Sequence, residues 1–111
     1  MFEHANQGAV DVIHPDVPLH QEYTGHLGEF LEESLHRGQP RVVLDMKDVP
    51  LVDSAGLELL IEVQENYQQR GGALKLAAPS PLCREIFEAT GVARRFEVYA
   101  DVTSAVGSFV Q

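Results

Sequence analysis

The residues with the clearest chemical potential form the run Asp53-Ser54-Ala55-Gly56-Leu57, which follows a short apolar segment and opens a long amphipathic stretch. An aspartate or serine in such a place caps a helix, because its side-chain oxygen accepts a hydrogen bond from a free backbone N–H. The free N–H groups and the helix dipole also favour negative charge there. The run therefore presents one serine hydroxyl where a phosphate, a partner protein or a reacting group can sit.

Ser54 as a catalytic nucleophile would need a base within hydrogen-bond reach and donors for an oxyanion. The nucleophile-elbow motif is absent, because Val52 stands where that motif has its first glycine. All the histidines precede residue 37, and His20 or His26 could approach the run, but no triad order is recognisable. We expect a protein that is not an enzyme.

The histidine and cysteine spacings argue against a metal or a redox centre. His20, His26 and His36 are not separated by the intervals that place two metal ligands on one helix face. Cys83 is the single cysteine and has no CxxC partner. We predict histidines on the surface or on helix faces, an inert cysteine, no metal and no cofactor.

Gly56 needs a separate explanation. Capping accounts for Asp53 or Ser54 in any protein, but a glycine inside the first helical turn costs about 1 kcal/mol of helix propensity. Sequences accept that cost where something must approach the backbone closely. We therefore expect a close contact at Gly56.

Composition narrows the classes of partner. The chain has 111 residues and a formal net charge of −9, from eight basic and seventeen acidic residues, and this charge disfavours direct binding of nucleic acid. No apolar run approaches the ~20 residues of a membrane span, and the first residues do not resemble a signal peptide. The expectation is one domain over residues 1–111, without membrane insertion, in the cytoplasm.

Apolar periodicity and breakers predict the elements that must position the run. A hairpin is expected first, with strands over 2–5 and 9–13 and a turn at 6–8, followed by a loop over 14–21. Helices are expected over 22–36, 54–70, 81–89 and from 102 onward, and strands over 41–46, 73–78 and 96–100. This alternation predicts an α/β fold with a mixed, mostly parallel sheet of four to five strands, about four helices and an antiparallel N-terminal edge.

The ordered set of motifs resembles the STAS family, typified by bacterial anti-sigma-factor antagonists. The resemblance rests on the strand at 43–46, the run at 52–57, Gly71-Gly72 after a long helix, the strand at 74–76 and the later Ser80-Pro81, Phe87, Thr90-Gly91 and Phe96. It covers roughly residues 9–110. The family pattern at the run is a hydrophobic residue, Asp, Ser or Thr, Ser or Ala, then Gly.

The resemblance implies a partner switch. Such antagonists bind a serine-kinase anti-sigma factor when unmodified, the kinase phosphorylates the hydroxyl residue after the motif aspartate, and a serine phosphatase reverses the modification. Here that residue is Ser54. We expect the partner-binding surface to comprise Asp53, Ser54, Ala55, Gly56 and Leu57 with part of the loop from Asp16 to His20.

Two positions depart from the family pattern. Ala55 stands where a second Ser or Thr is frequent, which leaves Ser54 as the only local phosphoacceptor. The loop before the first long helix reads Val17-Pro18-Leu19-His20, so His20 replaces the expected aspartate. The identity of the partner therefore stays open.

A second interpretation uses the same fold differently. Some small STAS proteins are subunits that bind the ATPase of a lipid-transport ABC complex, and there the motif hydroxyl supports an interface without any kinase.

Overall fold

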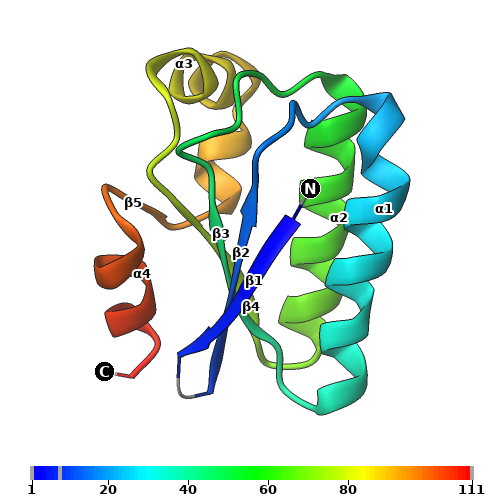
Figure 1. The fold of residues 1–111 in the computed structure, drawn as a ribbon, viewed down its shortest axis with the longest axis vertical. Coiled ribbons are helices and arrows are strands. Elements are labelled where there is room, and N and C mark those ends of the chain that lie inside the picture. The colour runs from blue at the N-terminus through cyan, green and yellow to red at the C-terminus, as the bar shows by residue number, and fades with distance from the viewer. Residues whose placement is uncertain (1, 8, 111) are drawn as a thin grey trace.

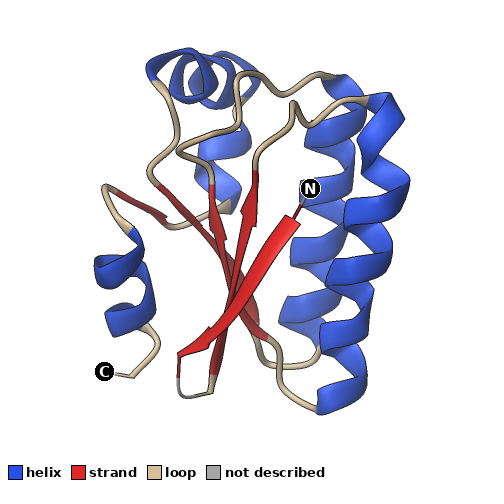
Figure 2. Cartoon of the chain, in the orientation of Figure 1, coloured by secondary structure: helices blue, strands red, loops and turns tan. Residues whose placement is uncertain are grey.

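The computed structural model describes residues 2–7 and 9–110, which form one five-stranded sheet with helices on both faces (Figure 1, Figure 2). The strands lie side by side in chain order, as β1 (Phe2–Gln7), β2 (Val10–Pro15), β3 (Arg41–Asp45), β4 (Ala73–Ala77) and β5 (Val98–Tyr99). β1 is antiparallel to β2, and all other neighbours are parallel. The predicted mostly parallel α/β sheet with an antiparallel N-terminal edge is confirmed.

The helices form two unequal layers. They are α1 (Gln21–Glu33), α2 (Ser54–Gln69), α3 (Pro81–Thr90) and α4 (Val102–Ser108), with short 3-10 turns over Ser34–Arg37 and Val92–Arg95. Figure 1 shows α1 and α2 side by side on one face of the sheet, α4 on the opposite face and α3 at the top of the view. No helix in residues 2–7 and 9–110 has the length and apolar character of a membrane span.

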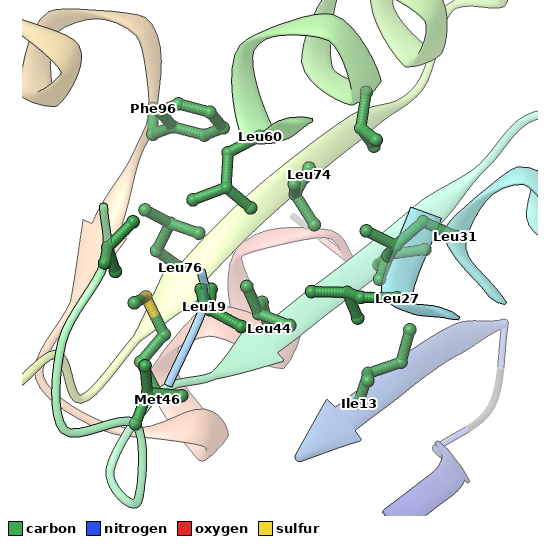
Figure 3. Close-up of a cluster of buried hydrophobic side chains, with 14 of the residues drawn as sticks. Ile13, Leu19, Leu27, Leu31, Leu44, Met46, Leu60, Leu74, Leu76 and Phe96 are labelled. Carbon is green, nitrogen blue, oxygen red and sulfur yellow. The ribbon is translucent and has the colours of Figure 1, made fainter. Parts of the chain in front are cut away.

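The larger core lies between the sheet and the layer of α1 and α2. Apolar residues of β2, β3 and β4 pack there against apolar residues of both helices. The same strands also carry apolar side chains on their other face, as buried parallel strands usually do. Figure 3 shows its centre, with Ile13, Leu19, Leu27, Leu31, Leu44, Met46, Leu60, Leu74, Leu76 and Phe96. Leu19 belongs to a loop, yet it is buried as completely as the strand residues.

The smaller core lies under α4 and contains a buried cation. Val10, Val12, Val43, Ala77 and Ala105 form it. Beside them, the Lys75 ammonium lies 2.7 Å from Ser108 Oγ and 4.1 Å from the centroid of the Phe109 ring. Hydrogen bonding and the ring face offset the cost of removing this charge from water.

Several boundaries differ from the predicted ones. β2 continues through His14 and Pro15, which the sequence assigned to a loop, because β1 pairs along its whole length. The parallel ladder to β3 ends at Ile13, so the proline without an N–H lies beyond it. The predicted helix over 22–36 ends at Glu33 and tightens into a 3-10 turn, and β5 has only two residues. Gly8, expected in the hairpin turn, lies outside the described residues.

Candidate functional site

The first turn of α2 forms at the carboxyl end of the parallel strands. Asp53 is its N-cap, and the Asp53 Oδ1 atom accepts a hydrogen bond from the Gly56 amide at 2.9 Å. Ser54 is the first helical residue and is exposed. Within the part of the chain that the structure describes, the amides of Ser54 and Ala55 have no acceptor, and the Ser54 hydroxyl has no partner. The helix thus begins with two free N–H groups beside an exposed hydroxyl.

Gly56 is buried, and a side chain at this position would not fit. A Cβ atom at this position would lie 2.2 Å from the Leu19 carbonyl oxygen and 2.9 Å from Val52 Cγ1. Any side chain would therefore displace the backbone of the neighbouring loop. The close contact that the sequence predicted at Gly56 is confirmed, and the approaching group is the chain's own backbone.

That neighbouring loop, residues 16–20, is joined to the segment before α2 by backbone hydrogen bonds. The Leu19 amide donates to the Leu51 carbonyl at 2.9 Å, and the Asp53 amide donates to the Leu19 carbonyl at 3.1 Å. Leu19 and Val52 form a parallel bridge, and both side chains are buried. These contacts join the two loops to each other at this edge of the sheet.

His20 is the N-cap of α1. Its Nδ1 atom accepts a hydrogen bond from the Glu22 amide at 3.1 Å, so the proton of the neutral ring lies on Nε2. The Oδ2 atom of Asp53 lies 3.4 Å from the Gln21 amide, which donates to it. The Asp53 carboxylate thus stabilises the first turns of both helices.

The remaining predicted site residues occupy different depths. Asp16 is exposed in the same loop as His20, at the end of β2. Ala55 is half-buried, and Leu57 packs partly against the larger core. The structure therefore presents Ser54 and Asp16 to solvent, with Asp53, Ala55, Leu57 and His20 partly accessible.

The ends of β2 and β3 and the turn after β3 form a charged cluster that local sequence patterns do not indicate. His14 Nδ1 lies 2.9 Å from Asp45 Oδ2, and His14 Nε2 lies 2.8 Å from Asp48 Oδ2. Burial opposes protonation of His14, but hydrogen bonds to Asp45 and Asp48 and their negative charges outweigh it and raise the pKa of His14 above 6.5. The predicted loop assignment of His14 is wrong, because this residue belongs to β2, and its side chain is partly buried. Only the tertiary pairing of β2 with β3 brings these groups together.

Comparisons with known proteins point to one family. Residues 5–105 match the STAS domain family. A Bordetella bronchiseptica protein named "Putative anti-sigma factor antagonist BtrV" is 33% identical over 79 residues, which cover 71% of this chain and 68% of the relative.

Solved structures with low sequence identity share the fold. A crystal structure from Thermotoga maritima, described as a putative anti-sigma factor antagonist, has a TM-score of 0.93 at 20% identity and covers 99% of this chain and 95% of its own. The unphosphorylated anti-sigma factor antagonist SpoIIAA has a TM-score of 0.83 at 17% identity, covering 98% and 96%. The chain belongs to the STAS domain family.

Proposed function

We propose that this protein is an anti-sigma-factor antagonist whose binding to a serine-kinase anti-sigma factor is controlled by reversible phosphorylation of Ser54. The observation that carries the proposal is the exposed Ser54 hydroxyl at the start of α2, with the free amides of Ser54 and Ala55 beside it. The names of the relatives support the same class of function.

The local electrostatics suit a switch. A phosphate on Ser54 would add about −1.5 to −2 charges at neutral pH and accept hydrogen bonds from the free amides, so the helix start would not need to refold. Asp53 is already negative beside it, and the added phosphate would increase repulsion toward an acidic partner surface. The unmodified surface of Asp16, His20, Asp53 to Ala55 and Leu57 would bind the kinase, and the modified surface would not.

The test uses the kinase and ATP directly. Incubation of the full chain with the anti-sigma kinase of its host and ATP should add one phosphate, measured by intact-mass spectrometry, and Ser54→Ala should abolish it. The matched control is Ser104→Ala, since Ser104 is also exposed in the first turn of a helix. A serine phosphatase of the same host should remove the group.

Two outcomes would contradict the proposal. Modification that persists in Ser54→Ala would move the phosphoacceptor elsewhere. Absence of modification by every host kinase of this class, together with stoichiometric binding of an ABC-transporter ATPase, would favour the ATPase-binding subunit instead.

A further inference from the structure

A groove of about 310 Å³ lies between α1 and α2, away from Ser54. Its apolar lining includes Leu59, Val63 and Tyr67, and the Tyr67 hydroxyl donates to the Leu31 carbonyl at 2.6 Å, which ties the two helices together below it. This volume is at the lower end of the range for protein binding pockets and suits a few inserted side chains. Figure 1 shows the two helices running side by side along this length.

Two glycines of α1, Gly25 and Gly28, line this groove and leave that wall without side chains at both positions. A Cβ atom at Gly25 would have no atom within 4 Å, and one at Gly28 would lie 3.2 Å from Leu59 Cδ1. Glycine inside a helix lowers helix stability, and at Gly25 no internal packing requires it. Because Gly25 has no side chain, the backbone of α1 is open there, and another helix can come close to it.

Acidic side chains dominate the charge around the groove. α1 carries four glutamates, α2 carries three, and neither helix contains a lysine or arginine. Three of these, Glu29, Glu32 and Glu62, line the groove, and none pairs with a cation among the described residues. The nearby Arg70 guanidinium donates to the Leu35 carbonyl at 3.0 Å and is the one arginine beside this groove among the described side chains.

We propose that this groove binds an amphipathic helix of a partner protein, with apolar side chains inserted between α1 and α2 and lysine or arginine side chains facing Glu29, Glu32 and Glu62. Helices recognise such grooves through apolar anchors spaced three or four residues apart. The opposite charges would steer the encounter and select the partner. A second copy of this chain is disfavoured, because two surfaces rich in glutamate would face each other.

The first experiment titrates the full-length ¹⁵N-labelled protein with a synthetic leucine–lysine amphipathic peptide of about five helical turns. Saturable amide shifts are expected at Gly25, Gly28, Leu59 and Asn66, with little change at Ser54. A leucine–glutamate peptide of the same pattern should produce none of them.

Charge-matched variants separate the groove from general attraction. The triple variant Glu29→Gln, Glu32→Gln, Glu62→Gln should weaken peptide binding at least about tenfold. The control Glu3→Gln, Glu85→Gln, Glu88→Gln changes net charge equally at exposed residues elsewhere and should change affinity less than about twofold. Equal weakening by both triples would overturn the proposal.

A steric variant tests the groove without altering charge. Gly25→Leu has free space for its Cβ and should keep or raise thermal stability while weakening peptide binding at least about tenfold. Ser54→Asp should leave peptide binding unchanged, so failure of the phosphorylation switch and failure of the groove are distinguishable. Unaltered binding by Gly25→Leu, shifts centred on the start of α2, or the same shifts caused by self-association of the protein would each overturn the proposal.

Discussion

The two helices that begin at the carboxyl edge of the sheet start in different ways. α2 has an aspartate cap and an exposed serine, whereas α1 is capped by the imidazole of His20 and receives part of its stabilisation from Asp53 of the other loop. The side-chain cap of α2 thus comes from its own segment, whereas the start of α1 also receives a hydrogen bond from Asp53 of the other segment. Removal of the Asp53 cap should therefore damage both helix starts, and removal of the His20 cap should stay local.

Gly56→Ala should produce the largest effect. The new Cβ would overlap the Leu19 carbonyl, so the two loops must separate, and we expect a loss of about 3 kcal/mol in the free energy of unfolding measured with urea. Gly25→Ala is the matched helix-glycine control and should gain up to about 1 kcal/mol. Equal midpoints for wild type and Gly56→Ala would show that the loops are not tightly joined.

Asp53→Ala should produce the second-largest loss of stability. It removes the acceptor of both the Gly56 and the Gln21 amides, and we expect a loss of about 2 kcal/mol. Hydrogen exchange should accelerate at the first turn of α1 as well as at that of α2. Asp53→Asn retains an acceptor oxygen and should lose much less; acceleration confined to α2 would disprove the shared role of the carboxylate.

His14→Gln should alter the pH dependence of stability. Because the folded-state pKa of His14 lies above the unfolded value of 6.5, its contribution is fully present below pH 6.5 and is lost as pH rises through the folded-state pKa. The free energy of unfolding in urea, measured from below pH 6.5 upward, should therefore be larger for the wild type than for His14→Gln, and this difference should shrink as pH rises. An advantage that grows with pH would contradict the geometry with Asp45 and Asp48.

His20→Asp should produce the smallest effect. Aspartate is a better cap than histidine, but it adds a negative charge near Asp53 and Glu22, so stability should change by no more than about 0.5 kcal/mol. This change in stability can be measured by thermal unfolding monitored with circular dichroism. A large loss would mean that the His20 ring, which lies 5.0 Å from the Tyr23 ring, contributes packing that the cap alone does not explain.

Local signals in the sequence predicted much of this fold. Proline and glycine punctuation placed α3 between the Ser80 cap and Gly91, which has a φ of 80° as its role as a helix terminator requires. The Asp53 cap and the close contact at Gly56 were also predictable. The partner in that contact, Leu19, was not, because parallel strands bring distant loops together only after the sheet has formed.

The same limit applies to charged groups. His14 alternates with apolar neighbours in β2, and nothing nearby in the sequence indicates Asp45 and Asp48 as its partners. The groove between α1 and α2 likewise depends on how two helices of separate segments pack. The sequence therefore predicts the type and order of most elements, whereas contacts between elements follow only from the structure.

The hydrogen bonds that join residue 19 to residues 51 and 53 use backbone atoms alone. Side chains at 16, 17, 18 and 20 can therefore be exchanged over evolutionary time while the loop keeps its register, provided that Leu19 stays apolar and Gly56 stays bare. His20, where the resemblance leads us to expect aspartate, would be such an exchange. New side chains around Ser54 could then change the specificity of this surface without moving the serine.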